Sequence, residues 1–282
     1  MSTATHEEST PDMEQFHPHR RWYRRPSVVV PVVLVVLGYS ILVSPLIQEQ
    51  NFFRPDVTAD GSVSFDWNFF IHLTPLMLQG LVVTVKATLI GFLLAVVLGF
   101  FLALGRRSHR RWLSWPVTAV IEFIRSTPLL VQLFFWQALV RSSEGINLQP
   151  ITILALGLGI HYATYCSEAY RAGINSVDKG QWEASTALNL SPVTSWTRVV
   201  IPQAVPNVLP ALGNYLVAGF KDAPMGVAVN VHGLLFFADQ VRNDTFRATE
   251  PYLIAGVGFL LVSLPAAWLV RRLEKRISYE RV

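Results

Sequence analysis

Long apolar stretches separated by short polar segments form the main pattern of the chain. Six of these stretches reach the roughly 20 residues that an α-helix needs to cross a hydrocarbon core. They lie at about 27–47, 75–104, 116–140, 151–172, 207–235 and 251–270. Core helices of soluble proteins seldom run so far without charged residues. The pattern therefore predicts an all-α fold class, that of a polytopic integral membrane protein with six transmembrane helices.

Lysine and arginine residues are distributed unevenly between the two sides of this predicted bundle. With the N-terminus in the cytoplasm, the cytoplasmic segments carry 16 of them and the opposite segments carry 4. Such an excess marks the cytoplasmic side of membrane proteins. No small-residue cleavage site follows the basic cluster at 20–25, so we expect an uncleaved anchor at 27–47. The sequence thus predicts a multi-pass protein with cytoplasmic N- and C-termini.

A polar interval between the fourth and fifth spans, which we call the elbow (residues 180–204), is too hydrophilic to cross a bilayer. Its pattern predicts two short helices. The first is opened by the glycine at its start and carries Glu183 in its first turn, where a carboxylate favours the positive helix end. It ends at Asn189, which tolerates the left-handed conformation of a C-cap. Ser191 offers an N-cap oxygen and Pro192 a preset φ, so a second helix starts at once.

The elbow resembles the EAA loop of bacterial ABC importer permeases, in which Glu-Ala-Ala, a later glycine and an Ile-x-Leu-Pro run form the helix that docks on the ATPase. The matching residues are Glu183, Ala184, Ser185, Asn189, Val199, Ile201 and Pro202. Asn189 replaces the glycine and keeps the left-handed conformation accessible. The resemblance implies a bacterial cell membrane protein with a coupling loop at 174–205. The residues that it implies for ATPase contact are Gly180, Gln181, Glu183, Ala184, Ser185, Leu188, Asn189 and Pro202.

The third span contains a Glu-x-x-Arg-x-Thr-Pro-Leu-x-x-Gln run, which resembles a signature of permeases for histidine, glutamine, glutamate, arginine and related solutes. Glu122 and Arg125 lie on one helical face near the cytoplasmic entrance, where they can pair. Pro128 interrupts the hydrogen-bond ladder and predicts a kink. A packing kink and a gate that bends during transport both fit this pattern. Arg125, Thr127, Pro128 and Gln132 are therefore candidates for the substrate pathway or gate.

A second pair of opposite charges closes the fourth span, in a Tyr-x-x-Glu-x-x-Arg-x-Gly-Ile run that resembles the same family. Glu168 and Arg171 repeat the three-residue spacing that lets side chains meet on a helix. Together with Glu122 and Arg125 they form the predicted cytoplasmic charge pairs. These pairs either join one network that responds to movement of the elbow or serve only as a topological anchor.

The fifth span carries Lys221 and Asp222 roughly 20 Å from its start, well inside the bilayer. Adjacent charges at that depth are costly unless they line water, protein or ligand. We expect the helix to break just beyond Pro224 and Gly226. The run resembles the Lys-Asp-Thr-Ser-Leu segment of amino acid permeases, with Ala-Pro-Met replacing Thr-Ser-Leu. Lys221 and Asp222 supply either the two charges that a zwitterionic solute needs or a pair that locks the broken helix to a neighbour.

Composition narrows the function classes. The chain of 282 residues is 51% hydrophobic and 15% charged, and its net charge of +4 comes from clusters that flank apolar spans. This placement fits a topology signal and predicts no nucleic acid partner. A single cysteine, Cys166, excludes an intramolecular disulfide and a thiolate metal pair, so we expect no metal site. The phosphate-cradling loop and the hydrolase motifs are absent, so we predict a non-catalytic protein.

The resemblance covers about 74–276 and implies a type I ABC importer transmembrane domain there. The expected division is a cytoplasmic tail (1–26), an N-terminal transmembrane anchor (27–47), an extracytoplasmic loop (48–73), this domain (74–276) and a second cytoplasmic tail (277–282). The family implies a cytoplasmic ATPase dimer that holds ATP and Mg, a second permease, identical or a sister chain, and an extracytoplasmic solute-binding protein. The chain itself is expected to lie in membrane lipid and to bind no cofactor.

Two other functions remain open at this stage. A secondary, ion-coupled amino acid transporter would work without an ATPase, but it needs a coupling-ion site and usually has inverted repeats, which the sequence does not show. A membrane enzyme would use Glu122, Glu168 or Asp222 as acid or base, although these carboxylates lie in separate spans. The solute is open as well: a polar amino acid, an opine, cystine or a compatible solute such as ectoine.

Overall fold

The structure is a computed structural model that describes residues 65–143 and 147–279. Every regular element in this part is helical, which confirms the all-α fold class there. The elements are α2 (Trp67–Arg107), α3 (Arg111–Arg125), α4 (Leu129–Ser142), α5 (Pro150–Asn175), α6 (Lys179–Ala187), α7 (Pro192–Ser195), η4 (Trp196–Val200), α8 (Ile201–Asp222), η5 (Ala223–Val229), α9 (Leu234–Thr245) and α10 (Thr249–Tyr279). The expected anchor at 27–47 lies outside the described residues, as does most of the expected outer loop.

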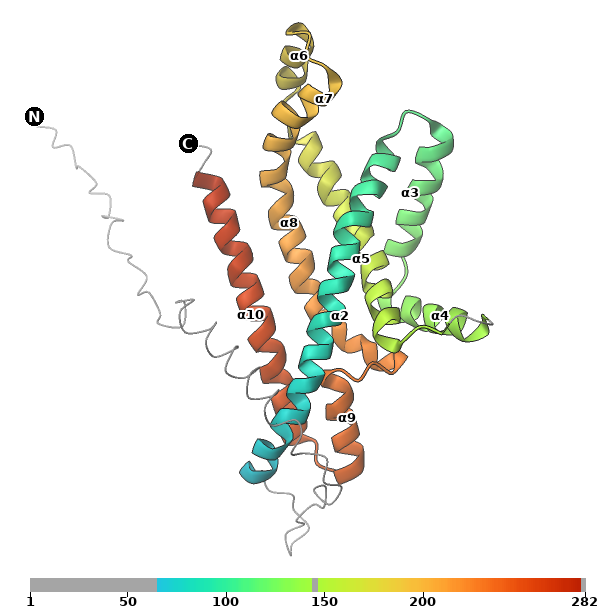
Figure 1. Cartoon of the computed structure of the whole chain (residues 1–282), viewed down its shortest axis with the longest axis vertical. Helices are drawn as coiled ribbons and strands as arrows, with labels where there is room; N and C mark the ends of the chain where they lie inside the picture. Colours follow the sequence, from blue (N-terminus) through green and yellow to red (C-terminus); the bar gives the residue numbers. More distant parts are fainter. Residues whose placement is uncertain (1–64, 144–146, 280–282) are drawn as a thin grey trace, which may run out of the picture.

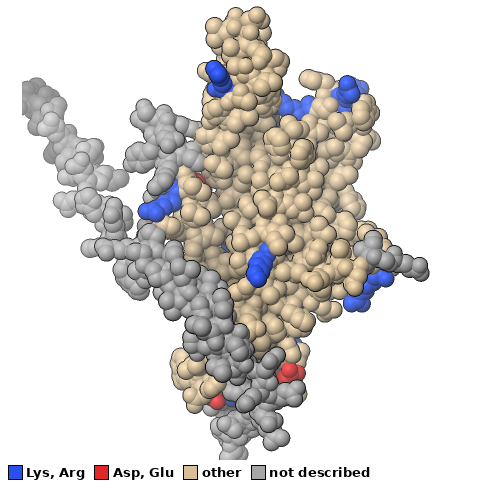
Figure 2. All heavy atoms as spheres, in the orientation of Figure 1, with Lys and Arg blue, Asp and Glu red and all other residues tan. Residues whose placement is uncertain are grey.

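Four long helices, α2, α5, α8 and α10, run along the longest axis of the molecule (Figure 1). The elbow helices α6 and α7 project at one end, which also holds the turn between α2 and α3 and the C-terminal end of α10. The start of α2 and α9 lie at the other end. In Figure 2, basic atoms are visible near the elbow and the α2–α3 turn, and acidic atoms at the end with α9. The segments that the sequence assigns to the cytoplasm therefore share one end.

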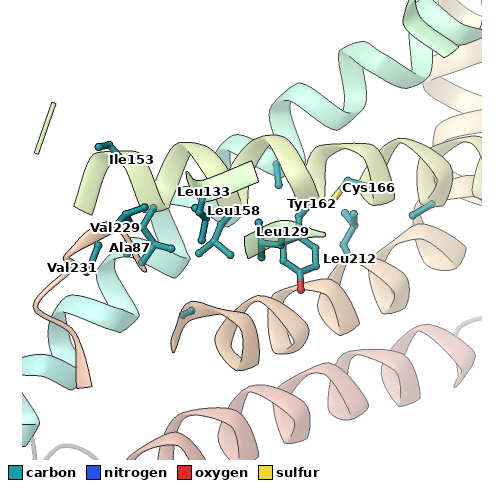
Figure 3. Packing of buried hydrophobic residues seen from close by; sticks show 14 of the residues in the cluster. Ala87, Leu129, Leu133, Ile153, Leu158, Tyr162, Cys166, Leu212, Val229 and Val231 are labelled. Carbon is teal, nitrogen blue, oxygen red and sulfur yellow. The ribbon is translucent and has the colours of Figure 1, made fainter. Parts of the chain in front are cut away.

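Helix α5 is the centre of the bundle, because α2, α4 and α8 all pack on it. Its contact with α2 depends on glycine. A methyl group at Gly99 would lie 2.7 Å from the carbonyl oxygen of Ala163, and one at Gly91 would lie 2.9 Å from that of Ala155. Such close backbone approach is typical of helices packed within membranes. The main core cluster surrounds α5 (Figure 3) and includes Ala87, Leu133, Leu158, Leu212 and Val229.

Two of the described helices, α2 and α10, are long and apolar enough to cross a membrane, and α3 with α4 makes a third if the bent pair is one span. Helix α5 is less apolar than α2 and α10, and it can carry polar residues because α2, α4 and α8 surround it. Its Thr164 and Ser167 are buried and donate to the carbonyl oxygens of His161 and Thr164 at 2.7 and 2.6 Å. Polar groups satisfied in this way are tolerated inside a helical bundle. The total of six spans stays a prediction.

The prediction of a single kinked helix for the third span is wrong. The chain bends by 108° between α3 and α4, and α4 runs sideways from α5, roughly perpendicular to the long axis of the molecule (Figure 1). Pro128, the residue before α4, has an extended backbone with φ −62° and ψ 136°. It also lacks an N–H group, so the helical hydrogen bonds cannot pass through it. A proline that the pattern assigned to a kink therefore ends one helix and starts another.

The span predicted at 207–235 is interrupted as well. The α-helix ends at Asp222, because Pro224 cannot continue its hydrogen bonds, and the chain tightens into the 3-10 turn η5. The α-helix thus ends just before Pro224, whereas the sequence predicted that it would end just beyond this residue. Asn230, with φ 58°, then ends η5. Thr84 Oγ1 on α2 accepts the N–H of Leu234 at 3.1 Å and so fixes the start of α9.

A buried ion pair fixes the start of α2 to the start of α10. Arg247 and Glu250 are 3% and 1% exposed, and their Nη2 and Oε1 atoms are 2.5 Å apart. The same Glu250 oxygen accepts the backbone N–H of Asp66 at 3.0 Å, and the Asp66 side chain caps α2. The Arg247 guanidinium also lies 4.9 Å from the centre of the Phe69 ring. Breaking such a pair is costly, because either charge alone would remain buried without compensation.

Candidate coupling elbow and translocation path

The first elbow helix, α6, begins one residue earlier than the sequence predicts. Asp178 is its N-cap and accepts the N–H of Gly180 at 2.7 Å. Since Lys179 is the first helical residue, Glu183 lies beyond the first turn. The expected stabilisation of the helix end by Glu183 is therefore wrong, and Asp178 takes that role. This aspartate was visible in the sequence, two residues before the glycine that drew the prediction.

The sharp turn between the elbow helices lies where the sequence predicts it. Asn189 has a φ of 51° and therefore adopts the left-handed conformation. Ser191 is the N-cap of α7, and its hydroxyl accepts the N–H of Thr194 at 3.2 Å. Pro192 follows as the first helical residue. These features are set by neighbouring residues, so a sequence pattern can find them.

Helix α7 continues through the π-helical turn η4 into α8, and the three elements form one rod. The N–H of Ile201 donates to the carbonyl of Trp196, five residues back instead of four. Pro202 comes next, and in a regular helix its ring would clash with the carbonyl four residues before it. The widened turn lies directly before that proline. Turns of this kind are frequent at functional sites.

Most residues that the resemblance assigns to ATPase contact are exposed: Gly180, Gln181, Glu183, Ala184, Leu188, Asn189 and Pro202. Leu188 is 72% exposed, and Val193 in the second elbow helix is 71% exposed. Ser185 differs, because it is 4% exposed and its hydroxyl donates to the carbonyl of Gln181 at 2.7 Å. Ser185 therefore supports α6 from within and cannot itself contact a partner.

Two tryptophans join the elbow to the end of α2. Trp182 in α6 and Trp196 in η4 meet edge to face, with ring centroids 5.5 Å apart. The guanidinium of Arg107 lies 5.6 and 5.8 Å from the centroids of these two rings, and it donates to Asn175 Oδ1 at 3.2 Å. This contact was not predicted from the sequence. Two tryptophans in an otherwise polar interval were the signal that would have indicated it.

A network of charged side chains lies around Glu168. Its carboxylate pairs with Arg171 at 2.6 Å, with Arg125 at 3.8 Å, and with Arg106, which it contacts most closely. Arg106 also pairs with Glu122 at 3.3 Å. The expected pair of Glu122 with Arg125 is therefore wrong: each of these residues pairs with a different helix. Arg106 is the partner of Glu122. In the sequence this arginine had served only as one of the positive charges that indicate the cytoplasmic side.

Adjacent residues in the last turn of α2 thus contact two different sites. Arg106 belongs to the charge network and Arg107 to the tryptophan pair of the elbow. Neighbouring positions on a helix point about 100° apart, so one helix end can serve both. The end of α2 therefore connects the elbow to the charge network.

The bend between α3 and α4 is completed by the side chain of Gln132. The carbonyl of Ile124 would normally accept the N–H four residues later, but that residue is Pro128, which has none. Gln132 Nε2 lies 2.7 Å from this carbonyl and 3.0 Å from the carbonyl of Thr127. Its Oε1 lies 3.3 Å from His161 Nδ1 on α5. Thr127, Pro128 and Gln132 thus form one unit at the bend.

An aromatic cluster continues from this bend toward the break after α8. Tyr162 and Tyr165 on α5 lie 6.0 Å apart by ring centroids, and both lie near Tyr215 on α8, at 6.4 and 5.8 Å. The Tyr162 hydroxyl donates to Asp222 Oδ2 at 2.6 Å. The Arg125 guanidinium lies 5.2 Å from the Tyr165 ring. The cluster therefore brings a carboxylate to a tyrosine hydroxyl and a guanidinium to a tyrosine ring. The sequence did not predict a role for these tyrosines.

Lys221 does not join Asp222 in this cluster. Asp222 is half-buried and bonded to Tyr162, whereas Lys221 is exposed, and no ion pair links the two within the described ranges. Successive residues of a helix face different directions. The two charges that the sequence predicted as a pair are therefore separated. Among the described residues, no group of three or more His, Cys, Asp or Glu side chains is placed to hold a metal ion.

The family described as "Binding-protein-dependent transport system inner membrane component" matches residues 95–279. This chain belongs to that family. The matched range includes the elbow, the charge network, the bend and the aromatic cluster. An inner membrane component is a membrane protein, which agrees with the apolar helices α2 and α10.

Relatives within this family of inner membrane components are permease proteins. A probable amino-acid ABC transporter permease protein, y4tG of Sinorhizobium fredii, is 43% identical over 76% of this chain and 90% of its own length. The glutamine transport system permease protein GlnP of Escherichia coli is 30% identical over 77% of this chain and 99% of its own. The crystal structure of an amino acid ABC transporter with histidines has a chain that matches with a TM-score of 0.70 at 33% identity, over 76% and 99% of the two chains. Such permeases are transport components and not catalysts.

Proposed function

We propose that the chain is the permease subunit of an ATP-driven importer for a polar amino acid or a related small zwitterionic solute. The named relatives are amino acid permeases, which supports this solute class. In this proposal the chain crosses the bacterial cell membrane six times, with an N-terminal anchor at 27–47, a transmembrane domain at 74–276, and both termini in the cytoplasm. It holds neither ATP nor Mg, which belong to a separate ATPase dimer.

The exposed elbow is the observation that carries the proposal. Helices α6 and α7 project beyond the bundle (Figure 1). Leu188 before the turn at Asn189 and Val193 after it are both exposed on the surface of this projection. Large apolar side chains on a polar projection are typical of a surface that another protein covers. A separate ATPase below the membrane is the partner that the family implies. Glu183 and Ala184 lie on the same exposed helix and are contact residues in this proposal.

Coupling then follows the contacts at the end of α2. When the ATPase moves the elbow, Trp182 and Trp196 move Arg107, and the adjacent Arg106 changes its distance from Glu168. Because Glu168 also holds Arg125 at the end of α3, the bend between α3 and α4 receives the displacement. ATP binding can change the solute affinity only if ATP and the solute each bind the two conformations with different affinity. The charge network is thus the proposed gate.

The aromatic cluster is the proposed solute path beyond this gate. A zwitterion needs a cation for its carboxylate and an anion for its ammonium group. Arg125 and Asp222 provide these charges, and the faces of Tyr162 and Tyr165 attract a cation as well. The structure separates Lys221 from this group, so Arg125 replaces it in the proposal. A second permease subunit and an extracytoplasmic solute-binding protein complete the importer.

Reconstitution into lipid vesicles tests the function. The chain is combined with the ATPase and the binding protein encoded beside it, and uptake of radiolabelled amino acids is measured with and without ATP inside the vesicles. Uptake that requires ATP and the ATPase supports the proposal. Uptake by the chain alone, driven by a sodium or proton gradient, would show a secondary transporter instead. A photoreactive residue at Ala184 should cross-link to the ATPase, and a cross-link to an external protein would contradict the topology.

A further inference from the structure

An apolar groove lies between the last turns of α2 and the first turns of α3. Its volume is about 550 Å³. Phe101 and Leu104 on α2 and Leu113 and Val117 on α3 form its walls. Arg107 at its mouth also contacts the elbow, whereas the four wall residues belong to neither the elbow, the charge network nor the aromatic cluster. These walls suit a hydrocarbon chain, because all four side chains are apolar.

Basic residues surround the mouth of this groove. Arg107 and Ser108 line it, and the exposed Arg110 and Arg111 follow at once in the chain. Within the part of the chain that the structure describes, no carboxylate forms an ion pair with Arg107, Arg110 or Arg111. In Figure 2 the basic atoms at the α2–α3 turn have no acidic atoms beside them. The mouth therefore offers positive charge to an anion.

Two tryptophans next to the groove indicate where it lies in a membrane. Trp112 and Trp115 are 70% and 79% exposed on the first turns of α3. Tryptophan is enriched at the level of lipid headgroups, and the cytoplasmic leaflet carries the anionic lipids. The groove lies at the same end of the molecule as the elbow (Figure 1). Its assignment to the cytoplasmic leaflet rests on the proposed topology, whereas its shape and charge do not.

We propose that this groove binds one anionic phospholipid, with an acyl chain between α2 and α3 and the phosphate at Arg110 and Arg111. An apolar channel with a cationic mouth is complementary to a molecule that has a negative head and a hydrocarbon tail. A second copy of the chain fits less well. A symmetric contact through this face would place the same basic patch on both sides, so like charges would meet.

Native mass spectrometry of the purified full-length chain tests the site. The protein is released from detergent with equal amounts of phosphatidylglycerol and phosphatidylcholine that have identical acyl chains. We expect phosphatidylglycerol to bind about 30-fold more tightly, or about fivefold for each of two arginines, which corresponds to ~1 kcal/mol per basic residue near a membrane surface. The Arg110→Gln/Arg111→Gln double variant should lose this preference. Equal retention of both lipids by the unmodified chain would overturn the proposal.

A matched control separates a site from general attraction between charges. Arg271 and Arg272 are exposed at the same end of the molecule but lie on α10, away from the groove. The Arg271→Gln/Arg272→Gln variant should keep the preference for phosphatidylglycerol. If both double variants reduce it equally, the basic residues act only through net charge and no site exists.

Filling the groove tests the acyl chain. Val117→Trp should lower the retention of both lipids at least fivefold while leaving the thermal unfolding midpoint near that of the unmodified chain; Leu104→Trp repeats the test from the opposite wall if Val117→Trp does not fold. Unchanged retention in a folded variant would contradict the proposal. A photoreactive residue at Val117 should form a lipid adduct, and a covalent dimer of the chain instead would assign the groove to a subunit interface.

Discussion

Removing the charge of Arg107 should uncouple ATP hydrolysis from solute uptake. Its guanidinium lies over the rings of Trp182 and Trp196 at 5.6 and 5.8 Å, and it donates to Asn175 Oδ1. Each exposed cation–π contact contributes ~0.5–1 kcal/mol. Arg107→Gln should therefore weaken the link between α2 and the elbow by about 1–2 kcal/mol. Coupling free energies between sites are typically 1–3 kcal/mol, so this loss is large enough to remove most of the coupling.

The assay is the number of solute molecules taken up per ATP hydrolysed in vesicles that contain the whole importer. We expect this ratio to fall about tenfold, since 1.4 kcal/mol corresponds to a factor of ten. The ratio for Arg107→Lys should lie between those of the unmodified chain and Arg107→Gln, because lysine keeps the charge and loses the planar stacking. Trp196→Leu combined with Arg107→Gln should be less harmful than the sum of the single changes, as expected for residues in contact.

Arg271→Gln is the matched control for Arg107→Gln. It removes an exposed arginine at the same end of the molecule, from α10, and should leave the ratio unchanged. A normal ratio in Arg107→Gln, with assembly of the importer unaffected, would refute the transmission of movement through α2. A variant that no longer assembles with the ATPase would instead show that Arg107 holds the elbow in shape.

Three further predictions concern the elbow, the bend and the buried ion pair. Glu183→Lys should leave folding and insertion intact but separate ATP hydrolysis from uptake, because Glu183 is exposed on α6; normal uptake in vesicles would count against the role of the elbow. Gln132→Leu removes the shortest hydrogen bond to the Ile124 carbonyl, which keeps the longer bonds from Thr127, and it also removes the amide donor of the Thr127 carbonyl. We expect a loss of ~1–3 kcal/mol and a lower midpoint of thermal unfolding in detergent, whereas an unchanged midpoint would mean that the bonds from Thr127 suffice. Arg247→Leu should destabilise the fold by about 3–5 kcal/mol, because Glu250 remains buried and charged. The Arg247→Leu/Glu250→Leu double variant should recover much of that loss, and a double variant no more stable than the single one would show that the pair is not the cause.

The sequence predicts best those features that neighbouring residues determine. Asn189 and Ser191 end and restart a helix by their own backbone and side-chain preferences, so the turn of the elbow was found at the right residues. The break after Asp222 was found to within a few residues for the same reason, since Pro224 cannot continue a helix.

Features that depend on packing were not predictable from one sequence. Glu122 and Arg125 have the spacing of a pair, yet each contacts a residue of another helix, because α3 packs near the end of α2 and beside α5. The size of the bend at Pro128 also depends on packing, since a proline fixes where a helix stops and not where the chain goes next. Tyr162 and Tyr215 occur in apolar runs, where an aromatic side chain indicates only core.

The amide of Gln132 has a consequence for the way the bend can operate. A backbone donor keeps its bond only in one geometry, whereas this amide sits on a side chain with rotatable bonds and can follow the Ile124 carbonyl as α3 swings against α4. If α3 does swing in this way within a membrane, the carbonyls of Ile124 and Thr127 can keep a hydrogen-bond donor while the angle changes. Because lipid offers no substitute donor, a bend without such a side chain would have to keep one angle.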